Sequence, residues 1–430
     1  MRKLRWLSVA VGTVALAALA ASNVATGGSA TTGVSGSISI VAKWTGDEQK
    51  SFEAVLGPFK KANPGLKIKF TGVGDNITQV LSTAVQGGHP PDIGEIPQPG
   101  LMTQFANRGK LKPIEFARSA ISKQYQPVWL QLGTVKSKLY GFFFKGANKS
   151  TIWYNVKSFK DAGVKPPTTW PEFLTAAKTL KASGTKAYSI GGADGWTLTD
   201  LFENIYLRTA GGAKYDQLTD HKIKWTDASV KTALKTMADV LEDGNNMAGG
   251  TDGALQTSFP DSVSNVFSDS PKAAMVIEGD FVPGVVASKN PLKPVSGYNQ
   301  FAFPSINGSK PAVMGGGDCL IVFKDTPAVR ALIKYLLTPQ AAEIWAKRGG
   351  FSSPNKLVKA SAYPDALSRA TATALAKASL FRFDMSDLAP SEFGGGGGTE
   401  WSLLQDFLKN PKDVDGIASK LEAAAAKAYK

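Results

Sequence analysis

The sequence contains little cysteine and little histidine. Among its 430 residues are one cysteine, Cys319, and two histidines, His89 and His221. One thiol cannot form an intrachain disulfide or a cysteine-rich zinc site, and neither histidine has metal-ligand spacing. Cys319 lies in the apolar run 319–323, which predicts a packed strand residue rather than a nucleophile. We therefore expect no metal, no cofactor and no catalytic residue set.

Long apolar runs and clusters of basic residues are scarce as well. After residue 21 no run has the roughly 20 apolar residues that a membrane-spanning helix needs. The formal net charge is +14, from 49 Lys and Arg against 35 Asp and Glu. Such a balance could suggest nucleic acid or an anionic surface. No basic cluster is interleaved with aromatics, so we expect a solvated basic surface and no nucleic-acid partner.

Residues 1–30 have the pattern of an export signal, followed by a linker over residues 31–36. An apolar stretch, 6–21, follows three basic residues, and Ala25 and Ala30 are candidate cleavage points. The segment 19–22 is similar to a bacterial lipoprotein box in which Ser22 replaces the lipidated cysteine. A hydroxyl cannot form the thioether, which argues against a lipid anchor. We expect a protein exported to the cell envelope, or secreted.

Beyond the linker, strand and helix patterns alternate. Residues 38–42 alternate as a strand, 48–62 carry helical spacing that ends at Asn63-Pro64-Gly65, and 66–70 alternate again. A helix over 77–86 and a strand from Pro91 follow. Strand, helix, strand at this spacing predicts parallel strands with crossovers, and the chain is long enough for two lobes. The fold class is therefore α/β.

A series of short motifs occurs in a fixed order along the chain. The most informative is Thr151-Ile152-Trp153-Tyr154-Asn155, followed by PPTTWPEF at 166–173, where Thr169 and Glu172 have capping-box spacing. The others are WTGDEQKSF from Trp44, NPGLKIKF from Asn63, GGHPPDI from Gly87, GWTLTD from Gly195, MVIEGDF from Met275, MGGGD from Met314, and helix starts at Thr326-Pro327 and Thr338-Pro339. Jointly they resemble the extracellular solute-binding proteins of carbohydrate ABC transporters (family 1, maltose-binding-protein-like).

This resemblance implies a two-lobed periplasmic-binding-protein-like fold of type II. Each lobe would have a central mixed sheet flanked by helices, and crossing strands would form the hinge. The expected lobes are 37–147 with 309–350, and 148–308 with 351–430. The implied function is high-affinity capture of a mono- or oligosaccharide in the cleft between the lobes. The implied partners are this carbohydrate ligand and the ABC transporter permease subunits, with the protein itself a monomer and not an enzyme.

A sugar site needs flat aromatic side chains against the C–H faces and polar groups around the hydroxyl rim. Tryptophans on expected loops are candidates for the faces: Trp44, Trp196 and Trp401. Strand alternation sends Trp153 and Tyr154 to opposite sides, so we expect one of them in the cleft. By resemblance, Asp47 and Glu48 lie where the family contacts sugar hydroxyls, and Asp280 and Phe281 where it carries a polar and aromatic pair.

The remaining candidates each have a competing structural interpretation. Asp92 belongs to a PDI motif whose role in the family is often structural, and Gln98 is held between Pro97 and Pro99. Gly316 would allow close backbone approach to a ligand and Asp318 would accept a hydroxyl, although a plain turn also fits. Arg382 could fork onto hydroxyls or pair with Asp384. For Gly394–Gly398 we expect a mobile loop at the cleft rim.

Two alternative functions remain open from the sequence. The same fold could bind a non-sugar solute such as a polyamine, because acids beside aromatics suit amines too. A secreted glycoside hydrolase needs two carboxylates about 5–10 Å apart, which the candidates could supply. However, no serine-centred elbow, histidine base or metal set accompanies them.

Overall fold

Two mixed β-sheets organise the chain in the computed structural model, which describes residues 33–289, 292–394 and 399–430. Residues 34–430 form one compact unit. The expected export signal and residues 395–398 of the glycine run lie outside the described residues.

The first sheet has the order β12-β11-β3-β1-β2, with β6 pairing on β11. Strands β1, β2 and β3 are parallel, whereas β11 runs antiparallel to β3 and β6. The predicted strand, helix, strand opening is thus confirmed. The strands are β1 (Gly36–Ala42), β2 (Leu66–Gly72), β3 (Ile93–Ile96), β6 (Gly141–Asn148), β11 (Val313–Val322) and β12 (Phe381–Phe383), and β4 (Thr134–Val135) pairs separately with β5 (Lys138–Leu139).

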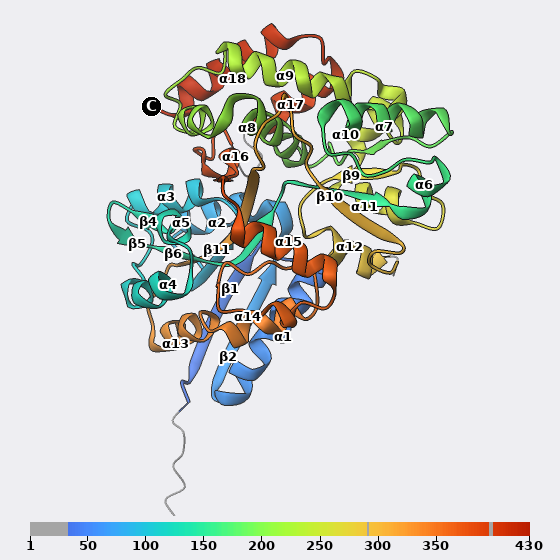
Figure 1. Cartoon of the computed structure of the whole chain (residues 1–430). Helices are drawn as coiled ribbons and strands as arrows, with labels where there is room; N and C mark the ends of the chain where they lie inside the picture. The colour runs from blue at the N-terminus through green and yellow to red at the C-terminus, as the bar shows by residue number, and fades with distance from the viewer. Residues whose placement is uncertain (1–32, 290–291, 395–398) are drawn as a thin grey trace, which may run out of the picture. The chain divides into compact units, whose positions relative to one another are not determined.

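Helices cover both faces of this sheet, and their apolar sides form the first core. Figure 1 shows α1, α13 and α14 in the lower part of the view, with α3, α4 and α5 at the left. The helices are α1 (Gly46–Ala62), α2 (Ile77–Gln86), α3 (Pro99–Asn107), α4 (Arg118–Gln124), α5 (Pro127–Leu132), α13 (Pro327–Leu336), α14 (Pro339–Ala346) and α15 (Ala366–Lys377). Thr326 and Thr338 cap α13 and α14 as predicted, because each hydroxyl accepts a backbone N–H three residues later.

The second sheet has the order β10-β7-β9-β8 and its own core. Its strands are β7 (Thr151–Asn155), β8 (Tyr188–Ser189), β9 (Met275–Ile277) and β10 (Tyr298–Ala302). Its helices are α6 (Val156–Asp161), α7 (Trp170–Ala182), α8 (Trp196–Thr219), α9 (Ala228–Leu241), α10 (Gly250–Gln256), α11 (Phe259–Phe267), α12 (Val282–Lys289), α16 (Met385–Leu388), α17 (Thr399–Lys409) and α18 (Val414–Ala428). In Figure 1 α8, α9, α17 and α18 gather at the end away from the first sheet. The predicted capping box opens α7, with the Glu172 carboxylate accepting from Thr169 N–H at 3.1 Å.

The chain crosses between the two sheets at β6–β7 and along β11. Strand β6 ends at Asn148 in the first sheet, and β7 begins at Thr151 in the second. In β11, Met314 belongs to the second core and Cys319 to the first. Two α/β lobes, each with a mixed sheet and joined by crossing strands, are therefore the fold that the resemblance implied.

One part of the expected lobe division is wrong. Residues 351–430 were assigned to the second lobe, but β12 pairs with β11 in the first sheet and Phe383 packs in the first core. The tail therefore stays with the first lobe as far as Phe383, since Phe351, Tyr363 and Ala372 also pack in the first core. Alternating Phe381 and Phe383 fit an added edge strand, which the resemblance alone did not reveal.

Across the described part of the chain, no helix has both the length and the apolar character to cross a bilayer.

Candidate functional site

The candidate site begins at the carboxyl ends of the parallel strands, the edge where α/β sheets bind ligands. Strand β1 ends at Ala42, so Lys43 and Trp44 follow it directly into the loop before α1. The Lys43 N–H donates to Glu95 Oε2 at 2.8 Å, which joins the ends of β1 and β3. Burial raises the pKa of Glu95 well above its usual value.

Trp44 connects this edge to the crossing strand β11. Its indole Nε1 donates to Asp318 Oδ2 at 2.7 Å, and its ring packs against Phe52 and Trp345. The Lys145 ammonium on β6 lies 3.5 Å from the same Asp318 oxygen and also pairs with Glu48. A buried lysine is thus held between two carboxylates of the first lobe.

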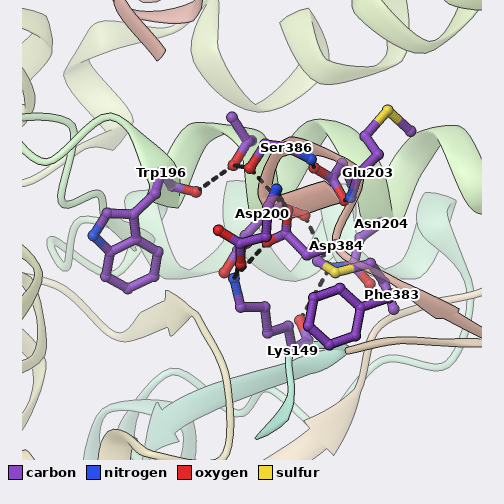
Figure 2. Close-up of polar contacts among 12 residues, drawn as sticks. Lys149, Trp196, Asp200, Glu203, Asn204, Phe383, Asp384 and Ser386 are labelled. Carbon is purple, nitrogen blue, oxygen red and sulfur yellow. Dashed lines mark hydrogen bonds and ion pairs between the residues drawn. The ribbon is translucent and has the colours of Figure 1, made fainter. Parts of the chain in front are cut away.

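A second buried lysine, Lys149, lies at the crossing itself. Its ammonium is 2.9 Å from Asp200 Oδ1 on α8, 2.6 Å from Asp384 Oδ2 and 3.9 Å from Asp387 Oδ2. Figure 2 shows the side chain reaching from the connection between β6 and β7 toward Asp200 and Asp384. A β-carbon at Gly316 would come within 2.9 Å of Lys149 Cε, so the missing side chain there leaves room for the lysine.

The three carboxyls around Lys149 differ in their ionisation. Burial lowers the pKa of Lys149, but the surrounding acids outweigh it and raise the pKa well above its usual value. Burial also acts on Asp384, yet Lys149 and the N–H of Asp387 hold its pKa at about 2. Burial and the neighbouring Asp384 carboxylate raise the pKa of Asp200 to about 7, although Lys149 acts in the opposite direction. Asp384 is therefore the ionised anchor of this cage.

An aromatic surface from the second lobe faces these lysines. Trp196 is the first residue of α8 and packs against Phe259 and Phe281, with ring centroids 5.2 and 6.0 Å away. Lys43 Nζ lies 5.2 Å and Lys149 Nζ 5.5 Å from the centre of the Trp196 ring. Cations at this distance from an indole are attracted by the ring electrons. The two lobes thus meet through lysines and aromatic rings.

Four buried polar atoms around this surface have no hydrogen-bond partner in the described structure. They are Trp196 Nε1, Asp200 Oδ2, Glu278 Oε2 and Asp280 Oδ1. Asp280 uses its other oxygen to accept from the Ser352 hydroxyl, and burial raises its pKa to about 6. Burial likewise raises the pKa of Glu278. One donor and three acceptors are therefore available to a ligand with several hydroxyls.

The structure brings seven of the sequence-predicted residues to this region. They are Trp44, Glu48, Trp196, Asp280, Phe281, Gly316 and Asp318. Trp44 is fully buried in the first core, so its ring supports Asp318 instead of presenting a face. Gly316 lies inside strand β11, paired with Ala147, so it is not in a turn.

The expectation that Trp153 or Tyr154 faces the cleft is not supported. The two side chains do point to opposite sides of β7, as alternation requires, but each packs in an apolar cluster. Trp153 is fully buried beside Tyr298, and Tyr154 packs on Phe159. Strand β7 is central in its sheet and covered on both faces, so neither side is open.

Two candidates serve the fold elsewhere. Asp92 precedes β3, at the opposite edge of the sheet from the site, and accepts from both the N–H and the hydroxyl of Ser39. Arg382 pairs with Asp216 of α8 and not with Asp384, whose carboxylate is paired with Lys149.

The last three candidates remain predictions. Asp47 is partly exposed and pairs with Lys50. Gln98 is buried after β3 and accepts from Thr78 at 3.4 Å. Trp401 is 8% exposed, and its Cβ would lie 2.8 Å from a β-carbon at Gly195, which places it behind the loop that carries Trp196.

Sequence reasoning missed the three lysines, Lys43, Lys145 and Lys149, and the acids Asp200 and Glu278. A signal existed for Lys145, because it follows Phe142-Phe143-Phe144 in a strand whose other residues are apolar or small. A lysine in such a run is rarely buried without a carboxylate partner. No cluster of three or more metal-binding side chains occurs in the ranges that the structure describes.

Comparison with known proteins identifies the family. The model of the bacterial extracellular solute-binding protein family matches residues 43–343. The osmoprotective compounds-binding protein GgtB of Synechocystis sp. is 32% identical over 385 residues, 86% of this chain and 88% of that protein. The alpha-glucosides-binding periplasmic protein AglE of Rhizobium meliloti is 31% identical over 401 residues, 90% and 86% of the two chains.

Solved structures agree on the fold. The bacterial solute receptor AcbH superposes with a TM-score of 0.81 at 18% identity, covering 92% of this chain and all of its own. A chitin oligosaccharide binding protein superposes with a TM-score of 0.78 at 22% identity, covering 92% and 99%. From its sequence match and its two-lobed fold, the chain belongs to the bacterial extracellular solute-binding protein family.

Proposed function

We propose that this protein is the extracytoplasmic binding component of an ABC importer and that it captures a mono- or oligosaccharide between its lobes. The observation that carries the proposal is the surface of Trp196 with its four unpartnered buried polar atoms. A buried polar group without a partner costs about 1–3 kcal/mol, so a ligand that pairs with these atoms gains affinity.

The chemistry of the surface suits a sugar. Trp196 offers a flat ring for a C–H face, and Phe281 lies beside it. Asp200, Glu278 and Asp280 each offer a free acceptor oxygen to a hydroxyl. We propose that Glu48 and Asp318 extend this rim from the first lobe, and that the remaining lobe boundaries follow the sequence prediction.

The names of relatives support the same ligand class. AglE is named for alpha-glucosides, and a multiple sugar-binding protein of Streptococcus mutans is 26% identical over 303 residues. GgtB is named for osmoprotective compounds, which makes a small osmoprotective solute the second candidate. A polyamine is the third, since carboxylates outnumber lysines around Lys149.

The proposed mechanism is hinge closure. Residues for the ligand come from both lobes, with Lys43, Glu48 and Asp318 on one and Trp196 and Asp280 on the other. A ligand that contacts both sets stabilises the closed arrangement, and a membrane permease would recognise that arrangement and accept the solute. Small-angle scattering should show compaction at saturating ligand, and an unchanged radius of gyration would contradict closure.

Isothermal titration of the purified protein tests the ligand class. The panel contains maltose, glucose, galactose, glycine betaine and putrescine. We expect a saccharide to bind and Trp196→Ala to abolish that binding, whereas Leu357→Ala, an exposed apolar side chain, should leave it unchanged. Binding of putrescine alone would assign the protein to amines, and turnover of an oligosaccharide would make it a hydrolase.

A further inference from the structure

Two of the three aromatic rings at the candidate site on the second-lobe side, Trp196 and Phe281, face lysines. Lys43 and Lys149 lie 5.2 and 5.5 Å from the centre of Trp196, and Lys145 lies 5.7 Å from the centre of Phe281. Aromatic faces are what proteins use to hold amines and quaternary ammonium groups. In this protein those faces are already directed at its own cations.

From this geometry we infer that the site selects uncharged, hydroxylated solutes and rejects cationic ones. The inference rests on the proposed function and narrows its ligand class. An amine placed on Trp196 would lie close to two fixed ammonium groups and be repelled by both. A neutral C–H face meets no such penalty. The lysines therefore act as specificity-determining residues.

The lysines are fixed in position, so an arriving cation cannot simply displace them. Lys149 has three carboxylate neighbours, and Asn204 Nδ2 donates to its backbone carbonyl at 3.0 Å. Lys145 is 4% exposed and is held by Glu48 and Asp318. To move, Lys149 would have to abandon Asp200 and Asp384, and Lys145 would have to abandon Asp318, and these buried carboxylates would then be left without a counter-charge.

The lysines also stay charged at neutral pH. Burial lowers the pKa of Lys145, but the nearby Glu48 and Asp318 outweigh it, so that its pKa lies above the ordinary lysine value. Lys149 is shifted in the same direction by Asp200 and Asp384. The repulsion of a cationic ligand is therefore present under ordinary conditions.

Acidic solutes are disfavoured by the other half of the site. At pH 7.5 the Asp280 carboxyl, whose pKa is about 6, is ionised, and its unpartnered oxygen is an acceptor that a hydroxyl can satisfy but a ligand carboxylate cannot. The ammonium group of Lys149 already donates to the protein carboxylates Asp200 and Asp384. No lysine near the rings is left over for an anion, so neutral hydroxylated compounds are the class that fits both halves.

Matched probes test the charge selection. Glucose and galactose are each titrated beside the corresponding 2-amino sugar and uronic acid at pH 7.5. We expect each charged form to bind about tenfold more weakly than the neutral sugar, or worse, from the like-charge contacts. A charged form that binds as well as its neutral counterpart would overturn the inference while leaving sugar binding intact. Binding of putrescine without any sugar would overturn both.

Lysine variants test the cause. In Lys43→Met and Lys149→Met the preference for glucose over glucosamine should shrink by about tenfold. Lys222→Met, at an exposed lysine paired with Asp220, should leave the preference unchanged. Lys43 has one ion-pair partner, Asp75, so Lys43→Met keeps the test valid if Lys149→Met does not fold. An unchanged preference in folded Lys43→Met contradicts the assigned role.

Discussion

At the residue scale, Trp44 and Trp196 show how one residue type serves two purposes. Trp44 is fully buried, and its indole donates to Asp318. Trp196 is 8% exposed, and its indole nitrogen has no partner in the described residues. Both residues lie at the site. The hydrogen bond and the complete burial make Trp44 a supporting residue, whereas Trp196 is the proposed contact surface for the ligand.

This difference predicts that a Trp→Phe substitution lowers stability at position 44 and lowers ligand affinity at position 196. Trp44→Phe leaves the buried Asp318 without its donor, so the free energy of unfolding should fall by about 1–3 kcal/mol. Trp196→Phe removes no protein hydrogen bond and should change stability by less, while weakening ligand binding. Urea denaturation and titration calorimetry of both variants measure the two effects. Equal losses of stability would contradict the distinction.

A second residue-scale prediction concerns Gly316. Its β-carbon would lie 2.9 Å from Lys149 Cε, so Gly316→Ala should displace the lysine from Asp200 and Asp384 and weaken ligand binding. Gly57→Ala is the matched control, because Gly57 lies in α1 with nothing near its β-carbon position. The control should keep its ligand affinity. Full affinity in Gly316→Ala would show that Lys149 tolerates displacement.

The sequence indicated which polar and aromatic residues are candidates, but it did not indicate which residues they contact. Asp280 and Phe281 could be identified because a family motif carries them. Lys149 could not, because its partners Asp200 and Asp384 are 51 and 235 residues away along the chain. Pairing across such separations depends on the tertiary fold, and a solvated lysine is the ordinary expectation.

At the element scale, the four-residue helix α16 depends on a buried glutamate. Glu203 on α8 accepts from the backbone N–H groups of Met385 and Ser386 at 2.8 and 3.0 Å, and from the Tyr215 hydroxyl. Figure 2 shows Glu203 beside this turn, with Asp384 between it and Lys149. The glutamate thus positions Asp384.

Glu203→Gln tests this positioning. An amide offers one acceptor oxygen instead of two and sets an N–H₂ group against a backbone donor. We expect about 1–3 kcal/mol of lost stability, faster hydrogen exchange in 385–388, and weaker ligand binding. Glu242→Gln, at an exposed carboxylate, is the control. Unaltered exchange in 385–388 would show that α16 does not need the carboxylate.

Helices and strands with a clear sequence pattern were predictable from the sequence. The elements that pack against them were not. Helices α13 and α14 begin at Thr-Pro pairs. The error at β7 arose because alternation fixes which side a residue takes, not what covers that side. The error at β12 arose because a three-residue edge strand has almost no periodicity.

At the scale of the whole molecule, burial of acids between the lobes should control how stability depends on pH. The pKa of Asp280 is about 6 and that of Asp200 about 7, both raised by burial from ordinary values near 4. The folded state therefore holds more protons than the unfolded state between about pH 4 and 7. The stability that the folded state gains by protonating Asp280 and Asp200 is fully present below pH 4. It is lost as the pH rises through the pKa values of these two groups. Asp384 has the opposite sign, but it acts only between its pKa of about 2 and the ordinary value.

Ligand-free protein should therefore lose stability from pH 5 to pH 8. The raised pKa of Asp280 alone corresponds to about 3 kcal/mol over the whole range above pH 4, of which roughly half is lost between pH 5 and pH 8. Asp280→Asn has no carboxyl to titrate at this position, so its stability should depend less steeply on pH. Urea denaturation at pH 5, 6, 7 and 8 measures both slopes, with Asp161→Asn, an exposed carboxylate paired with Lys157, as the control that should follow the wild-type curve. A wild-type curve that rises with pH would show that the buried acids are ionised in the folded protein. The charged cage around Lys149 would then dominate the energetics of the site.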